Sequence, residues 1–362
     1  MKKALTMPND PGVYHHSALE KSRETLKASD AKETSARIEA REAGRWNHRP
    51  VTPLAQNPLF QWPPRPLDIL RWYGAYWIEI STVSLSFLVA LAVYFTVLPG
   101  LAEMQVLAWG WVIKVWLANL VPQVICAGTL HYWLVMRKGQ GDHTKFDPRD
   151  QARSNGTFTF GNQVYDNMFW HIVSGITLWT AAQVLVFWAM ANGYAPVLFF
   201  PGNPVWFIAL FVLIPIWSSF HFYWVHRLLH WPPLYKLAHA LHHRNINVGP
   251  WSGISMHPVE HLLFYTTFLI HLVLPTHPIH LMFHGYTQSM HPVFSHSGFE
   301  KLQVAGADRM TAGDFFHQLH HRYFECNYGT IEMPWDRWFG SYHDGSARAT
   351  EETRARKTQM YT

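Results

Sequence analysis

The chain has 362 residues, of which 49% are hydrophobic, 15% aromatic and only 15% charged. Soluble domains carry about 25% charged residues, so this composition argues against an ordinary soluble enzyme and favours a membrane protein. The net charge of +5 suits contact with anionic lipid headgroups, and no compact basic run interleaved with aromatic residues indicates a nucleic-acid partner. The two cysteines, Cys126 and Cys326, do not make a disulfide framework.

Residues 1–66 are expected to form a polar N-terminal tail, partly disordered, and a proline-rich linker. The tail mixes charges, and its segment 17–43 is helix-prone but lacks a broad apolar face. Six prolines between residues 50 and 66 predict an extended linker. Aromatic residues typical of a membrane interface follow at Trp72, Tyr73, Tyr76 and Trp77.

Apolar segments predict an all-α integral membrane protein whose scaffold occupies residues 67–200. A bilayer-spanning helix needs about 20 apolar residues, and four stretches meet this length: 77–98, 106–136, 168–190 and 203–222. The segment 262–290 contains Pro275 and Pro278, so we expect it to form a broken or re-entrant helical hairpin. The fold class is therefore about four transmembrane helices, this hairpin and a histidine-rich helical cap.

The distribution of basic residues predicts the orientation in the membrane. Lys and Arg are frequent in the first 74 residues and in the loop 137–167, whereas the connections 99–104 and 191–202 contain none. By the positive-inside rule, the N-terminus, this loop and the chain after residue 222, except the hairpin, are cytoplasmic. The histidine clusters then lie together at the cytoplasmic membrane face.

Histidine clustering is the strongest functional signal in the chain. Seventeen of the 24 histidines lie between His221 and His321. Neutral imidazole is the commonest metal ligand and suits iron, copper, nickel and zinc. On a helix, residues i, i+3 and i+4 share a face, so the motifs HALHH (239–243) and HQLHH (317–321) each present three imidazoles. This number exceeds what one tetrahedral site uses and predicts two metal ions in one cage.

Isolated histidines such as His131, His171 and His271 are more often hydrogen-bonded residues of a helical bundle than ligands. His221 lies five residues from His226, well off one helical face, so both bind metal only if the backbone bends. Paired Glu-x-x-His motifs of ferritin-like sites and the HExxH motif of zinc proteases are absent from the sequence. A histidine-dominated pair of irons therefore fits best, with zinc as the main rival, also in a purified sample.

The histidine-rich segments resemble the fatty acid hydroxylase and sterol desaturase superfamily of integral membrane di-iron enzymes. The matching string runs from YWVHRLLH (223–230) through LYKLAHALHH (234–243) and SGISMHPVEH (252–261) to DFFHQLHHRYFECNYGTIEMPWDRWFG (314–340). The resemblance implies a catalytic domain at 201–345, followed by a polar C-terminal tail at 346–362.

The resemblance also implies site residues. The catalytic metal ligands are expected to be His226, His230, His239, His242, His243, His317, His320 and His321. Further expected metal ligands are His221, His291 and His296. His257, Asp314 and Asn327 are expected to orient ligand imidazoles, although Asp314 also has the right chemistry and position for a helix N-cap.

The implied reaction is hydroxylation or desaturation of an unactivated C–H bond of a lipid, which uses two irons, O2 and electrons. The first 74 residues lack the HPGG haem motif of a fused cytochrome b5, so the electrons come from a separate ferredoxin or cytochrome b5 type donor. We expect a bacterial inner membrane rather than the endoplasmic reticulum. Two alternatives stay open: a histidine-rich metal transporter, and a zinc-dependent membrane hydrolase with Asp314, Glu260 or Glu325 as its base.

Overall fold

The computed structural model describes residues 44–55 and 57–361. The chain divides into a unit of residues 1–45 and a unit of residues 46–362, and the description below concerns the second unit. The helix-prone segment predicted at 17–43 lies outside the described residues.

The first apolar segment forms two helices separated by a bend. A short turn of 3-10 helix, η1 (Pro58–Phe60), precedes α2 (Pro66–Ile78) and α3 (Thr82–Thr96), and α2 and α3 meet at an angle of 43°. Helix α2 ends with Glu79 as its C-cap, and Ser81 caps α3, because its hydroxyl accepts a hydrogen bond from the backbone N–H of Ser84. The predicted span 77–98 therefore corresponds mainly to α3.

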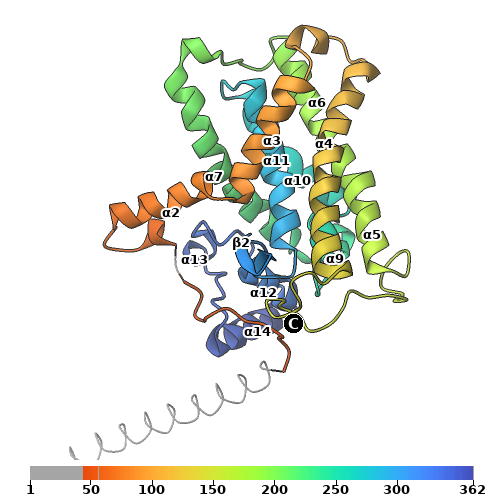
Figure 1. The fold of residues 1–362 in the computed structure, drawn as a ribbon, viewed down its shortest axis with the longest axis vertical. Helices are drawn as coiled ribbons and strands as arrows, with labels where there is room; N and C mark the ends of the chain where they lie inside the picture. Colours follow the sequence, from red (N-terminus) through yellow and green to blue (C-terminus); the bar gives the residue numbers. More distant parts are fainter. Residues whose placement is uncertain (1–43, 56, 362) are drawn as a thin grey trace, which may run out of the picture. The chain divides into compact units, whose positions relative to one another are not determined.

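Three longer helices are apolar enough to cross a membrane (Figure 1). The first is α4 (Trp109–His131), continued by the π-helix η3 (Tyr132–Met136). The second joins α5 (Gln163–Phe169), the π-helix η4 (Trp170–Ile176) and α6 (Thr177–Ala191). The third is α7 (Pro204–Leu229). Within the described residues these make three candidate spans, or four if α2 and α3 count as one.

The predicted broken hairpin corresponds to α10 (Pro258–Tyr265), the 3-10 helix η8 (Thr266–Leu272) and α11 (Pro278–Ser295). Figure 1 shows α11 inside the bundle, where it packs on α3 and α7. Isolated histidines pair within the hairpin: His271 Nε2 lies 2.9 Å from His284 Nδ1, and His284 Nε2 lies 3.0 Å from the Thr267 hydroxyl. These histidines thus have the hydrogen-bonded role expected of lone polar residues in a bundle.

The cap below the bundle consists of short elements. Helical elements of the cap are α8 (Pro232–Leu234), the π-helix η6 (Tyr235–His239), α9 (Ala240–His243), α12 (Phe315–Tyr323), α13 (Trp335–Trp338) and α14 (Ala347–Tyr361). Further 3-10 turns occur at η2 (Leu101–Met104), η5 (Phe200–Gly202) and η7 (Pro250–Ser252). An antiparallel hairpin of β1 (Lys301–Val304) and β2 (Ala307–Thr311) pairs Lys301 with Thr311. The all-α prediction omitted this small sheet.

Trp46, just before the proline-rich region, and Leu54, within it, pack on the cap. Trp46 and Leu54 are buried in one cluster with Phe315 and Leu319 of α12. The Leu54 amide donates to the carbonyl of Asp344 at 2.9 Å. The prolines restrict the backbone conformation of the segment. Burial of the two apolar side chains against α12 stabilises its position on the cap.

Candidate metal centre

Nine buried histidines converge where the bundle meets the cap. They come from the end of α7 (His226, His230), from η6 and α9 (His239, His242, His243), from the end of α11 (His296) and from α12 (His317, His320, His321). Each is at most 5% exposed. Such burial of so many polar side chains needs partners, because an unpaired buried polar group is costly.

The nine side chains form two groups, in each of which the candidate ligand atoms all lie within 4.8 Å of one another. The first group comprises His226, His230, His239, His243 and His320. The second comprises His242, His296, His317 and His321. The groups adjoin, since the ring centroids of His243 and His321 are 4.9 Å apart.

Each HxxHH motif contributes to both groups. In the first motif, His239 and His243 at i and i+4 join the first group, whereas His242 at i+3 joins the second. In the second motif the assignment is reversed, because His317 and His321 join the second group and His320 joins the first. Each of the two helical segments therefore contributes histidines to both groups. Helical periodicity alone suggested that the three imidazoles of one motif converge on one point, and they do not.

The spacing of the nitrogen atoms fits a bound metal. In the second group, His296 Nε2 lies 3.0 Å from His321 Nε2 and 3.1 Å from His317 Nε2, and the last two are 3.2 Å apart. Metal–nitrogen bonds of about 2.1 Å at tetrahedral or octahedral angles separate the nitrogens by about 3.0–3.4 Å. The triangle of nitrogens thus has the size of one face of a coordination shell.

The first group has the same spacing. Nε2 of His226 lies 3.1 Å from Nε2 of His239, and His243 Nε2 lies 3.2 Å from His230 Nε2 and 2.9 Å from His320 Nε2. Facing lone pairs at these distances repel unless a proton or a metal cation lies between them, and the spacing fits a metal ion in both groups.

In several of the nine histidines, an oxygen atom holds the opposite ring nitrogen and fixes the tautomer. Nδ1 of His230, His243 and His321 has no hydrogen-bond partner among the described residues. Nδ1 of His226 donates to the carbonyl of Tyr328 at 2.7 Å, Nδ1 of His320 to the carbonyl of Cys326 at 2.6 Å, and Nδ1 of His296 to the carbonyl of Pro292 at 2.9 Å. A proton on Nδ1 leaves the lone pair on Nε2 for a metal. Burial also lowers the pKa of His242, His317 and His320, which keeps the imidazoles neutral.

Two buried carboxylates approach the first group. Glu260 Oε1 accepts from His239 Nδ1 at 2.7 Å, and Glu325 Oε1 lies 3.5 Å from His230 Nδ1. The sequence placed both only among possible bases of a hydrolase. The signal for an orienting role was the carboxylate in HPVEH, which lies in the first turn of α10.

His221 and His291 lie outside both groups. His221 Nε2 is 2.8 Å from the Thr266 hydroxyl, and His291 Nδ1 is 3.2 Å from the Thr82 hydroxyl. His221 points away because α7 continues without interruption from Pro204 to Leu229, so residues five apart face different directions.

The residues expected to orient ligand imidazoles have other contacts. His257 caps α10 by accepting from the backbone N–H of Val259 at 3.2 Å. Asp314 caps α12 by accepting from the N–H of Phe316 at 2.8 Å, which is the alternative role considered for it. Asn327 donates to the carbonyls of Phe316 and His343. These three side chains shape the cap, whereas backbone carbonyls and Glu260 hold the imidazoles.

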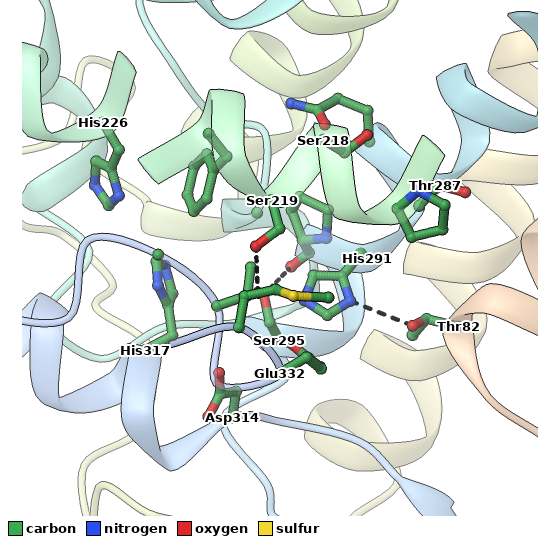
Figure 2. A pocket seen from close by; sticks show the side chains of 18 of the residues that line it. Thr82, Ser218, Ser219, His226, Thr287, His291, Ser295, Asp314, His317 and Glu332 are labelled. Carbon is green, nitrogen blue, oxygen red and sulfur yellow. Dashed lines mark hydrogen bonds between the residues drawn. The ribbon is translucent and has the colours of Figure 1, made fainter. Parts of the chain in front are cut away.

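A largely apolar pocket extends from the histidines towards α2 and has a volume of about 1230 Å³, which includes the space at its mouth. His226 and His317 line one end, and Asp314 lies beside them (Figure 2). The aromatic residues predicted at the membrane interface, Trp72, Tyr73, Tyr76 and Trp77, line the pocket on the side of α2. A long apolar molecule can thus reach both the membrane-side helices and the histidines.

Comparison with known proteins finds sequences that are similar to this region. Residues 210–341 match the family model of the fatty acid hydroxylases. The chain is 34% identical over 121 residues to a Delta(7)-sterol 5(6)-desaturase of Saccharomyces cerevisiae, which covers 33% of this chain and 32% of the relative. A Delta(7)-sterol 5(6)-desaturase of Candida albicans is 32% identical over 165 residues, 43% of this chain and 40% of the relative. No solved structure matches.

Residues 210–341 therefore resemble the fatty acid hydroxylases and sterol desaturases, as the histidine motifs predicted. The apolar helices are those of an integral membrane protein. The matches span less than half the length of each relative named here. Both relatives are fungal and give no support to the expected bacterial inner membrane.

Proposed function

We propose that the chain is a membrane di-iron oxidoreductase that hydroxylates or desaturates an unactivated C–H position of a lipid. The observation that carries this proposal is the position of two groups of convergent imidazoles at the end of an apolar pocket. Iron at this position supplies the oxidising chemistry with O2, which amino-acid side chains do not provide. The relatives' names, sterol desaturases, support a lipid substrate.

The side chains of this chain have distinct roles in the proposal. His226, His230, His239, His243 and His320 hold one ion, and His242, His296, His317 and His321 hold the other. Glu260 and the carbonyls of Tyr328, Cys326 and Pro292 keep the Nδ1 protons in place. The pocket excludes water and aligns one carbon of the lipid with the histidine groups.

Domain limits, orientation and electron donor belong to the same proposal. The catalytic domain comprises 201–345, the membrane scaffold 67–200 and a C-terminal segment 346–362, and the histidines face the cytoplasm. A separate ferredoxin or cytochrome b5 type donor supplies the electrons and docks through charge complementarity to basic surface residues.

The test combines metal analysis with product analysis. The full chain is expressed in a host membrane, and its metal content is compared with O2- and reductant-dependent mass shifts of +16 or −2 in host lipids. His320→Ala should abolish oxidation and lower bound metal, whereas His143→Ala, on an exposed loop outside both groups, should change neither.

Three results would contradict the proposal: unchanged turnover in His320→Ala, metal uptake into vesicles without lipid oxidation, and lipid hydrolysis that depends on zinc but not on O2. The second is the outcome that a transporter predicts, and the third is the outcome that a zinc hydrolase predicts.

A further inference from the structure

Exposed aromatic side chains gather where α13 meets the end of α7. Phe220 and Trp224 on α7, and Trp338 and Phe339 at the end of α13, are between 37% and 62% exposed. The rings adjoin, because the ring centroids of Trp224 and Phe339 are 4.8 Å apart and those of Phe220 and Trp224 are 6.4 Å apart. We call these four residues the α13 patch. A contiguous exposed apolar patch marks a surface that another molecule or a membrane covers.

The level of α13 along α7 places the α13 patch at the boundary of the membrane. The hydrocarbon core takes about 20 helical residues, so a span that begins at Pro204 reaches its other edge near Tyr223. Trp335 of α13 packs at this level, since its Nε1 donates to the Ser219 hydroxyl at 3.1 Å and its ring centroid lies 5.2 Å from that of Phe220. Figure 1 shows α13 beside the lower part of α7. Although α13 belongs to the cap, it lies at the depth where Trp and Tyr side chains of membrane proteins concentrate.

Two exposed arginines, Arg227 and Arg337, border the α13 patch. Arg227 follows Trp224 by three residues on α7, and Arg337 lies on α13. Arg227 Nη1 donates to the Tyr223 hydroxyl at 2.6 Å and to the Phe339 carbonyl at 3.1 Å, which holds the guanidinium beside the patch. The other guanidinium nitrogens of Arg227 can donate to a phosphate.

Within the segments that form this surface, no exposed carboxylate offsets the two positive charges. Residues 220–231 contain no Asp or Glu, and Asp336, the one acidic residue in 335–340, is 1% exposed. Its carboxyl group accepts from the backbone N–H groups of Tyr328 and Gly329, both at 2.8 Å. The exposed face is thus aromatic and cationic, which suits anionic lipid headgroups. A soluble acidic protein matches the charge but does not reach rings that lie at the depth of the membrane.

We propose that the α13 patch, with Arg227 and Arg337, is an interfacial anchor that binds anionic phospholipid headgroups and fixes the cap to the membrane. The anchor adjoins the pocket, because Thr330 lines the pocket and its Oγ1 lies 2.9 Å from the Ser219 hydroxyl that Trp335 also contacts. It thereby holds this wall of the pocket at the membrane boundary. The anchor does not depend on the chemistry proposed for the histidines.

Spin labels test the depth of the α13 patch in the full chain, reconstituted in nanodiscs of phosphatidylcholine and phosphatidylserine. A label on Trp338→Cys, in a Cys126→Ser background, is compared with labels on two other exposed sites, Leu117→Cys on the apolar helix α4 and Gln359→Cys on α14. The quantity measured is relaxation by O2, which concentrates in lipid, relative to relaxation by a water-soluble nickel complex. This ratio at Trp338→Cys should be much higher than at Gln359→Cys and approach that at Leu117→Cys.

Two outcomes of this measurement overturn the anchor. A ratio at Trp338→Cys equal to that at Gln359→Cys would place the α13 patch in water, where a soluble partner could bind it. Weak relaxation by both reagents at Trp338→Cys would show that a second copy of the chain, and not lipid, covers the patch.

Photoreactive lipids test the preference for anionic headgroups. A phosphatidylserine with a diazirine close to its headgroup should crosslink to the peptide that contains α13 at least about 5-fold more than the matched phosphatidylcholine. The double variant Arg227→Gln/Arg337→Gln should remove this preference, whereas Arg153→Gln/Arg309→Gln, which changes two exposed arginines outside the patch, should keep it. Equal crosslinking of both lipids in the unchanged chain, or an unchanged preference in the first variant, overturns the proposal. Because neither assay needs metal or turnover, the anchor can fail while lipid oxidation is confirmed, and it can succeed where no lipid is oxidised.

Discussion

At the scale of single residues, the reversed use of the two HxxHH motifs determines what each histidine does. His239 and His317 occupy the first position of their motifs but belong to different groups. The sequence alone treats them as equivalent, whereas the structure places them in different groups.

Single substitutions should therefore remove metal selectively. We expect His239→Ala to reduce bound metal by about half and His317→Ala to do the same, while the double variant loses nearly all of it, because each single variant leaves one group intact. Elemental analysis of purified protein measures this stoichiometry. Complete loss of metal in both single variants would show one indivisible cage instead of two groups.

Glu260 should affect metal affinity through His239. We expect Glu260→Ala to weaken metal binding about 10- to 100-fold, because His239 Nδ1 loses its acceptor. Glu260→Gln should weaken it much less, since the amide oxygen still accepts this hydrogen bond. A chelator competition titration distinguishes the two, and equal losses in both variants would mean that the charge of Glu260 matters more than its hydrogen bond.

At the scale of elements, the close approach of η7 to α11 supports the second group. A Cβ on Gly253 would lie 2.3 Å from the Pro292 carbonyl oxygen, and this oxygen accepts from His296 Nδ1. The α11 backbone must shift to admit any larger side chain, and His296 would shift with it.

Gly253→Ala should therefore lower both stability and metal content. We expect a destabilisation of about 1–3 kcal/mol from the steric clash and a loss of metal from the second group. Thermal unfolding and elemental analysis measure the two effects. Gly110→Ala, where a Cβ meets nothing within 4 Å, is the control, and a Gly253→Ala protein with full metal content would refute the link.

The sequence predicted those elements whose signal is local. Hydropathy located the long helices, and helical spacing identified the HxxHH faces. Helical spacing predicts which residues share one face of a helix but not what that face contacts. It therefore did not reveal that His242 and His320 each belong to a different group from the other two histidines of their motif. Burial of Trp46 and Leu54 depends on side chains of α12 that lie far along the chain, so the local sequence did not predict it. Strands β1 and β2 are too short to show a clear alternation of apolar and polar residues.

At the scale of the whole molecule, the charge distribution predicts which face of the membrane holds the histidines. Tyr194 and His143 lie in exposed positions of two loops that the positive-inside rule assigns to opposite sides. In intact cells, an impermeant thiol reagent should label Tyr194→Cys but label His143→Cys only after permeabilisation. The parent chain, with Cys126 half-buried and Cys326 buried, gives the background, and the reverse labelling pattern would invert the assigned orientation.

The packing of Trp46 and Leu54 on α12 has a consequence for the order of synthesis. Arg322 lies 3.7 Å over the Trp46 ring, and the Leu54 amide binds the Asp344 carbonyl. Trp46 and Leu54 leave the ribosome before the helices α2 to α11, but their partners Phe315, Leu319, Arg322 and Asp344 follow those helices in the chain. The cap therefore closes only after the segment from Phe315 to Asp344 is translated, so both histidine groups are completed only then.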